Sequence, residues 1–385
     1  MQSSTTQVNF TLSENPEETA AAQAARLLWA QISSGADSDF SSLLAAAAEH
    51  GISPQLAVTH PNAPEAKALR REITLLHALH IAVLGPIAAR CAAEGIPLLV
   101  FKGAALAVSH YPDSGMRLRV DSDIWVPLAA RTAVSQILIN LGGTPGLANV
   151  SVLTHPEQCF SFDSAGTTVQ IDLHWASNSK LCLAHATPFA QVWQEAVAFP
   201  GLSGARMPNP AWALLLAAAH RVGHHRDTMR LVWLLDMQLL WGAMTSADQA
   251  HVVALAQRHR LCGVLLHCLL ETQAYIPLAL NDGVREQLAH SARNEPATDL
   301  LQYRGPGWRI NLRHATWPER WLIIKEKLLA DQSYLHARFG PHPRWQSPWY
   351  QTKRWLQRGR TAPDTIKAMR QESDPGSASE SSSLR

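Results

Sequence analysis

The chain has 385 residues, of which 46% are hydrophobic, and its formal net charge is +2 at pH 7. This length is enough to bury a large core and predicts more than one domain. A net charge so near zero gives no argument for nucleic-acid binding by the molecule as a whole. The first residues lack the basic and apolar parts of a secretory signal, and no apolar run approaches the roughly 20 residues of a membrane span. We therefore expect no transmembrane segment.

The five cysteines bear on the cellular compartment in which the protein is expected. Their number is odd and they show no Cys-x-x-Cys spacing, so the sequence predicts neither a disulfide framework nor a zinc ribbon. Cys262 and Cys268 lie in a leucine-rich helical stretch and are interpreted as small buried hydrophobic residues. Because disulfides are rare in the reducing cytoplasm, we expect a cytoplasmic protein.

Residues 1–94 are predicted to form an N-terminal helical region. Pro16 favours a helix start, since proline suits the first helical turn. Alanine- and leucine-rich stretches follow and are interrupted near residues 33–35. Residues 64–94 then carry apolar side chains at helical spacing. Within this stretch Pro86 removes a backbone donor, so a kink or a split is expected there.

Residues 95–186 are predicted to form a compact core of strands and helices. The elements expected are a buried strand at 97–101, a short helix opened by Gly103, a strand at 121–126, a helix at 128–141, and a hairpin whose turn contains Gly166 and whose second strand is 167–175. Together they predict a small mixed sheet with helices on one side, the α+β class, followed by a largely helical C-terminal region.

Three aspartates on these strands predict a metal site. Asp121 and Asp123 are two residues apart on one strand, so they point to the same face about 7 Å apart. Asp172 lies on the polar face of the last strand of the core and supplies a third carboxylate. Such a set suits one or two divalent cations, Mg²⁺ or Mn²⁺, and phosphoryl or nucleotidyl chemistry. Asp172 is also a candidate for deprotonating an acceptor hydroxyl. The alternative is that these acids bind no metal and only form ion pairs with nearby arginines.

Basic residues close to the aspartates are candidates for phosphate binding. Lys102 and Gly103 stand at the end of the first strand, and Arg117 and Arg119 precede the second strand. They would neutralise charge on a triphosphate, although alternate residues in a loop need not both face the site. His174 shares the polar face with Asp172 and is a candidate for lining the cleft.

Residues 187–300 are predicted to form a helical bundle that covers one wall of the cleft. An Asn-Pro pair at 209–210 is expected to cap its first long helix. His220, His224 and His225 form a group that suggests zinc, because the first two share one helix face, but no Glu follows His220 and no third ligand is evident. We therefore expect them to pack the helices or line the cleft. Asp236 is expected to do the same and to pair with Arg230 or a histidine.

Residues 301–370 are predicted to form a basic, tryptophan-rich helical segment. Between residues 303 and 360 there are 12 Lys or Arg and three acidic residues, a difference of +9, together with six tryptophans. This composition suits a helical cap whose basic face is exposed to solvent, or a segment that contacts RNA or an anionic membrane. Residues 371–385 are polar and serine-rich, which predicts a disordered tail.

The combined pattern resembles a known family. Its motifs are Lys102-Gly103, Tyr111, an arginine before Asp121-x-Asp123, the IDLHW sequence around Asp172, and the stretch from 219 to 240. They are similar to the uncharacterised bacterial nucleotidyltransferases, a branch of the polymerase-beta-like superfamily, over roughly residues 70 to 270. The resemblance implies a small sheet of nucleotidyltransferase type and a nucleoside triphosphate substrate. One departure from the wider superfamily is that Lys102-Gly103 replaces the usual Gly-Ser turn.

These observations predict a metal-dependent nucleotidyltransferase. It would transfer a nucleoside monophosphate to an unknown acceptor hydroxyl or phosphate and release pyrophosphate. The acceptor is a small molecule, a peptide or RNA, with RNA suggested by the basic C-terminal segment. The alternative is a catalytically degenerate module of the same fold that binds a nucleotide or a protein, which the missing Gly-Ser turn favours.

Overall fold

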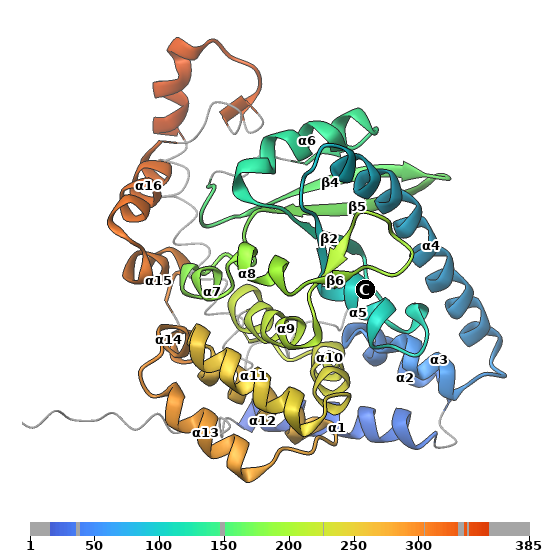
Figure 1. Cartoon of the computed structure of the whole chain (residues 1–385). Coiled ribbons are helices and arrows are strands. Elements are labelled where there is room, and N and C mark those ends of the chain that lie inside the picture. The colour runs from blue at the N-terminus through green and yellow to red at the C-terminus, as the bar shows by residue number, and fades with distance from the viewer. Residues whose placement is uncertain are drawn as a thin grey trace, which may run out of the picture. The chain divides into compact units, whose positions relative to one another are not determined.

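The computed structural model describes residues 16–35, 39–146, 151–225, 227–303, 305–329, 335–336 and 339–353. Backbone contacts divide the chain into a large unit, Met1–Gly146 with Ser151–Ile323, and a small unit, Leu147–Val150 with Ile324–Arg385. The large unit holds the sheet and most of the helices (Figure 1). The predicted tail at 371–385 lies outside the described residues, and the five-part division made from sequence stays a prediction.

One mixed sheet of seven strands forms the centre of the large unit, with the order β3-β4-β5-β2-β1-β7-β6. The strands are β1 (Leu99–Phe101), β2 (Asp121–Trp125), β3 (Thr144–Pro145), β4 (Glu157–Ser164), β5 (Thr167–His174), β6 (Val197–Ala198) and β7 (Arg206–Met207). The central pair β2 and β5 is parallel, and β1 is antiparallel to β2. The sheet and the helical region after it confirm the predicted α+β class.

The hairpin of β4 and β5 fixes the pairing of the residues around the site. Its two-residue turn, Ala165-Gly166, has positive φ at both positions, 52° and 77°, as a type I′ turn requires. The turn pairs Ser164 with Thr167 and continues in register along both strands. The hairpin predicted from the sequence is therefore confirmed, with glycine in the expected place.

The helices of the large unit begin and end close to the residues at which the sequence predicted helix starts and ends. They are α1 (Pro16–Ser34), α2 (Phe40–Glu49), α3 (Ser53–Thr59), α4 (Pro64–Ala93), α5 (Lys102–Ser109), α6 (Arg131–Asn140), α7 (Leu181–Ala186), α8 (Phe189–Gln194), α9 (Pro210–His224), α10 (Leu231–Gly242), α11 (Ser246–His259), α12 (Cys262–Tyr275), α13 (Asp282–Ala292), α14 (Asp299–Gln302) and α15 (Gly307–His314). At the start of α9 the Asn209 side chain accepts a hydrogen bond from the backbone N–H of Trp212, which confirms the predicted cap.

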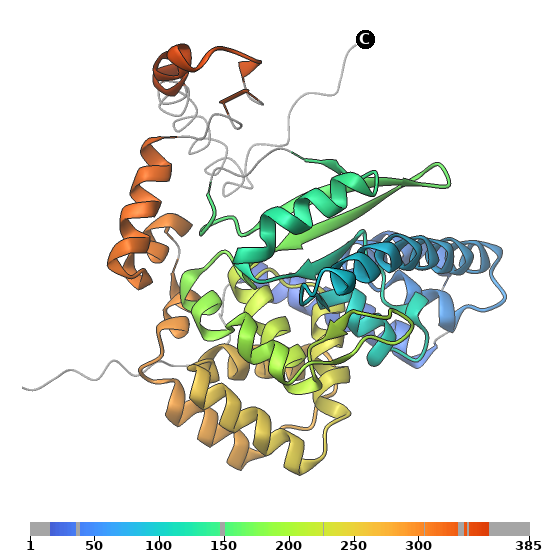
Figure 2. The ribbon, with the colours of Figure 1, turned by 45° about the horizontal axis from the view of Figure 1, so that its top comes forward.

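Helices cover both faces of the central strands, whereas the sequence predicted helices on one side. On one face Leu84 of α4 and Ile137 of α6 share an apolar cluster with Ile124 and Ile171 of the sheet. On the other face Trp125 belongs to the large cluster of the helical bundle. Figures 1 and 2 show α4 and α6 on one side of the strands and the bundle on the other. The prediction was wrong because strand residues of alternating direction are buried on both sides.

Helix α4 is one continuous helix from Pro64 to Ala93, so of the two expectations at Pro86 the split is wrong and the kink stays a prediction. Its buried side chains, among them Leu84, Ile87 and Cys91, pack on the sheet. By length and composition α4 is the one helix of the described residues that is apolar enough to span a membrane, although the sequence suggested no such segment. Its packing against β5 and α6 is that of a core helix in a folded domain.

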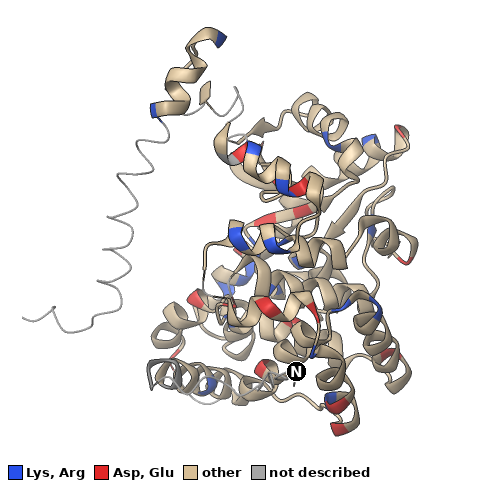
Figure 3. Ribbon diagram, turned by 90° about the vertical axis from the view of Figure 1, so that its left-hand side faces the viewer, with Lys and Arg blue, Asp and Glu red and all other residues tan. Residues whose placement is uncertain are grey.

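The basic C-terminal segment is described in part. Helix α16 (Trp317–Leu328) starts in the large unit, and a short 3₁₀ turn, Arg344–Gln346, lies in the small unit. Within the small unit, the ring of Tyr350 lies 4.0 Å from that of His342. Trp355 lies outside the described residues. Figure 3 shows acidic and basic residues mixed over the described ribbon in that view, in agreement with a net charge of +2.

Replacing Ala165 by asparagine is expected to stabilise the protein. An alanine at φ 52° is in the left-handed region, which costs an L-residue about 1–2 kcal/mol, and asparagine tolerates that region better. We expect Ala165→Asn to raise the free energy of unfolding by about 0.5–1 kcal/mol, measured by urea denaturation. Thr168→Asn, at an exposed position of the same hairpin, is the control and should not stabilise. Equal or lower stability of Ala165→Asn would contradict the strained turn.

Candidate active site

The three predicted carboxylates come together because β2 and β5 run parallel and in register. Asp123 is paired with Asp172, and Asp121 lies two residues before Asp123 on the same strand. Side chains alternate along a strand, so Asp121 and Asp123 share a face while Ser122 is fully buried on the other face. Asp121, Asp123 and Asp172 all line one cavity.

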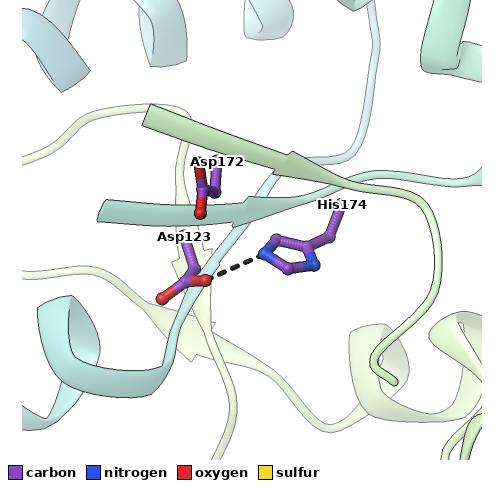
Figure 4. A group of neighbouring side chains, drawn as sticks. All are labelled: Asp123, Asp172 and His174. Atoms are coloured by element: carbon purple, nitrogen blue, oxygen red, sulfur yellow. Dashed lines mark hydrogen bonds and ion pairs between the residues drawn. The ribbon is translucent and has the colours of Figure 1, made fainter. Parts of the chain in front are cut away.

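The tightest group of potential metal ligands contains a histidine. One ligand atom each from Asp123, Asp172 and His174 lie within 4.8 Å of one another. Figure 4 shows the Asp172 carboxylate pointing toward Asp123, and His174 Nε2 facing Asp123 Oδ1 at 2.8 Å. On the other side of the ring, His174 Nδ1 lies 3.5 Å from a carboxylate oxygen of Glu157. When one ring nitrogen of a histidine binds a metal, the other keeps its proton. A carboxylate at the position of Glu157 can accept a hydrogen bond from that second nitrogen.

Asp123 is the buried charge around which the site is built, with only 6% of its surface exposed. The Lys102 Nζ donates to Asp123 Oδ1 at 2.6 Å, the same oxygen that faces His174. Burial by itself would raise the pKa of Asp123, but the Lys102 ammonium and the hydrogen bond from His174 outweigh it and hold that pKa well below its ordinary value. Asp123 is therefore an anion at neutral pH.

The two other aspartates have the opposite shift. Burial, together with the charges of Asp123 and Asp172, raises the pKa of Asp121 to about 7. The pKa of Asp172 is also raised, by burial and by Asp123. Such like-charge crowding is relieved when a cation or a proton is shared among the carboxylates. The cluster is therefore ready to accept a positive charge.

The turn between β1 and α5 places Lys102 against the acids. Lys102 is the first residue of α5 and has φ 54°, in the left-handed region that side chains other than glycine seldom adopt. The adjacent Gly103 does not have a positive φ, and a Cβ there would meet the Arg117 guanidinium at an ordinary 3.6 Å. The residue with the unfavourable backbone conformation in this turn is therefore Lys102, not Gly103.

Arg117 connects the core to the helical bundle. Its Nε and Nη2 donate to the two carboxylate oxygens of Asp236 on α10, both at 2.8 Å, and the Tyr111 hydroxyl donates to Asp236 Oδ1 at 2.7 Å. The sequence suggested Arg230 or a histidine as the partner of Asp236, which is wrong. Asp236 lies about one and two-thirds helical turns beyond Arg230, and Arg230 instead donates to the backbone carbonyl of Glu49.

Arg119 lines the cavity but reaches toward the opposite face of the sheet. Its Nη1 lies 2.8 Å from His77 Nδ1, and its Nε donates to Ser122 Oγ at 3.3 Å. Among the described residues no partner is found for its buried Nη2. Among the residues that the structure describes, no carboxylate forms an ion pair with this guanidinium, although the charge of Asp121 acts on it.

Three histidines from the end of α9 line the opposite wall of the cavity. His220, His224 and His225 line this wall, and His225 Nε2 lies 2.9 Å from His220 Nε2. Burial lowers the pKa of each, and that of His225 to about 4, and the Lys102 ammonium adds to this lowering in all three. They are therefore neutral near pH 7 and offer hydrogen bonds rather than charge. In the described part of the chain, the compact metal-type group is that of Asp123, Asp172 and His174, and these three histidines are not in it.

The cavity has a volume of about 280 Å³ and lies between the sheet and the bundle. The predicted candidates that line it are Lys102, Gly103, Arg117, Arg119, Asp121, Asp123, Asp172, His220, His224 and Asp236. His174 is fully buried behind Asp123. One wall is therefore acidic and basic, while the other combines imidazoles with an apolar floor formed by residues such as Leu216 and Ala217.

Three polar or aromatic lining residues were not among the site candidates from the sequence, namely Glu157, Arg230 and Trp233. Glu157 was within reach, because the two-residue turn at Ala165-Gly166 places it opposite His174 by counting back along the hairpin. Arg230 and Trp233 enter the cavity through the packing of α10, which no local pattern reveals. His225 stacks on Trp233 with ring centroids 4.1 Å apart.

Removing the Asp121 charge is expected to stabilise the fold above pH 7. The folded pKa, about 7, is above the ordinary 3.8, so the unfolded state loses its proton first and stability falls as pH rises through this window. We expect Asp121→Asn to raise the free energy of unfolding at pH 8 by about 1–2 kcal/mol, allowing for partial exposure. The gain should shrink at pH 5, where the wild-type carboxyl is protonated in the folded state. A gain independent of pH, measured by urea denaturation, would contradict this assignment.

Loss of Asp236 is expected to destabilise the protein strongly. Asp236→Ala leaves the Arg117 guanidinium buried without its carboxylate, which costs about 3–5 kcal/mol. Glu94→Ala is the matched control, since it breaks an exposed pair with Arg90 and should cost less than about 1 kcal/mol. Similar losses in the two variants, by chemical denaturation, would show that the Arg117 pair is not needed for stability.

The comparison with known families agrees with this geometry. The description "uncharacterised nucleotidyltransferase" belongs to the family whose profile matches residues 36–277. No curated protein matches the chain. The matched part contains the sheet, the three aspartates, Lys102 and the bundle helices through α12. The chain is therefore a member of the uncharacterised nucleotidyltransferase family.

Proposed function

We propose that the protein is a metal-dependent nucleotidyltransferase. It transfers a nucleoside monophosphate from a nucleoside triphosphate to an acceptor hydroxyl or phosphate and releases pyrophosphate. The observation that carries the proposal is the register of two parallel strands, which sets Asp123 beside Asp172 on the wall of a cavity that Asp121 and Lys102 also line. Family membership supports the reaction class.

The carboxylate cluster fits a divalent cation. Asp123 and Asp172 supply oxygen donors, Asp121 lies next to them, and His174 adds a nitrogen. Two carboxylates alone suit Mg²⁺, and the imidazole also suits Mn²⁺. A bound cation of this kind polarises the α-phosphate and stabilises the leaving pyrophosphate.

The cations of the cavity fit the remaining charge of a triphosphate. Lys102, Arg119 and Arg230 line the cavity, and no ion pair of Arg119 or Arg230 with a carboxylate is found among the described residues. Arg117 is engaged with Asp236 by two hydrogen bonds, so its part is to shape the pocket. We assign Lys102 to the phosphates, with Arg230 as an addition to the sequence prediction. The Arg119 guanidinium contacts His77 and Ser122 on the other face of the sheet and would have to turn toward the cavity to reach the phosphates.

Asp172 fits the role of proton acceptor. Its raised pKa brings it closer to that of a base that works near neutral pH. In this step the acceptor O–H proton passes to Asp172, the acceptor oxygen bonds to the α-phosphorus, and the bond from that phosphorus to pyrophosphate breaks. The acceptor remains a small molecule, a peptide or RNA in this proposal. A cytoplasmic location is also proposed, in keeping with five free cysteines.

Replacing the paired aspartates tests the assignment. Asp123→Asn and Asp172→Asn should each reduce metal-dependent pyrophosphate release by at least about 100-fold, because both lose charge at the metal and phosphate position. Release is measured with each nucleoside triphosphate, with Mg²⁺ or Mn²⁺, and with candidate acceptors. Asp282→Asn is the control, since that carboxylate is 88% exposed at the start of α13 and should retain full activity. Unchanged release in the two site variants would reject the proposal.

A second candidate is a degenerate module that binds a nucleotide without transferring it. It is favoured by the turn between β1 and α5, where Lys102 stands in a strained conformation and the superfamily's Gly-Ser is missing. Calorimetry with a nucleoside triphosphate and Mg²⁺ separates the two candidates. Binding with no pyrophosphate release for any acceptor favours the module.

A further inference from the structure

The Lys102 ammonium lies against two members of the group of potential metal ligands, Asp123 and His174. Nζ is 2.6 Å from Asp123 Oδ1 and 3.4 Å from His174 Nε2. These two atoms also lie 2.8 Å from each other. They belong to the compact group whose atoms are suited to a metal. The lysine is therefore an internal cation held against two of the three ligands.

A divalent cation and this ammonium compete for the same oxygen. A metal bound to Asp123 Oδ1 at the roughly 2.1 Å of a magnesium–oxygen bond would meet a positive charge already at hydrogen-bond distance from that oxygen. Both groups are largely shielded from solvent, since the side chains of Lys102 and Asp123 are 13% and 9% exposed. Repulsion between two cations is poorly screened in such surroundings. Binding of the metal to Asp123 therefore requires the ammonium to leave this oxygen.

The backbone holds Lys102 in this place at a cost. Its φ of 54° lies in the left-handed region, which is unfavourable for an L-residue and is typical of functional positions. A glycine would adopt this conformation freely. The presence of a lysine with a long, flexible stem indicates that its charge is needed at this turn.

We infer that Lys102 closes the Asp123 cation position until a triphosphate binds, so that metal and nucleotide bind cooperatively. This inference rests on the proposed nucleotidyl transfer and adds an order to its binding steps. The anionic ligand draws the ammonium from Asp123 to its phosphates, and the freed carboxylate then accepts the metal. Without nucleotide, the lysine satisfies Asp123 and keeps the buried carboxylate from remaining unpaired.

The test measures Mn²⁺ binding by electron paramagnetic resonance, which counts free Mn²⁺ and does not depend on turnover. The full-length wild-type protein is titrated with Mn²⁺ alone and in the presence of a triphosphate analogue with an α,β-methylene bridge. Lys102→Met keeps the length of the side chain without its charge, and Lys102→Gly also removes the backbone strain. Lys67→Met is the matched control, because Lys67 is exposed on α4 and does not line the cavity.

The two Lys102 variants should bind Mn²⁺ alone at least about tenfold more tightly than wild type, the effect of removing a competing buried charge. The analogue should raise Mn²⁺ affinity by a larger factor in wild type than in either variant, since only the wild type has an ammonium to displace. The Lys67→Met protein should behave as wild type.

Two results would overturn different claims. If both Lys102 variants bind Mn²⁺ no better than wild type, or if the analogue's effect is the same in all proteins, Lys102 does not close the site, while the nucleotidyltransferase proposal stands. If wild type and variants fail to bind Mn²⁺ even with the analogue, the metal-dependent function is itself wrong.

Discussion

The ionisation of Asp123 is the constraint on which the rest of the site depends. A carboxylate with 6% exposure is stable in the folded state only if cations and hydrogen bonds replace the lost water. Lys102 and His174 supply them to a single oxygen. This pairing keeps Asp123 charged, and its charge adds to the burial that raises the pKa of Asp121 and Asp172. One buried anion thus contributes to the protonation of its two neighbours.

The helical bundle serves both as a wall of the cavity and as a clamp on the core. The Arg117–Asp236 pair fixes α10 against the loop before β2, and α9 carries the histidines to the opposite side of the cavity. A pair with two parallel hydrogen bonds has a defined geometry, so it positions the wall as well as stabilising it. The same arginine contacts the position of Gly103, which links the clamp to the turn that carries Lys102.

Much of the site was predictable because it lies on regular strands. The alternation of side chains placed Asp121 with Asp123 and set Asp172 on a polar face, and the hairpin turn was recognised from its glycine. The partners were less predictable. Arg117 was expected at phosphate and is paired with Asp236, whereas Glu157 and Trp233 were overlooked. The contacts of Arg117 and Trp233 depend on packing that local patterns do not reveal, whereas Glu157 follows from the register of the hairpin.

The sequence by itself determined the α+β class, the hairpin register, the caps of the helices and the set of acids and bases that makes a metal and phosphate site plausible. These follow from backbone conformation and from periodicity, which are local properties. Tertiary structure alone decided that β2 and β5 are parallel neighbours, that helices cover both faces of the sheet, and that Lys102 rather than Arg117 meets Asp123. These follow from burial, since a charge taken out of water accepts whichever partner the packing brings within reach.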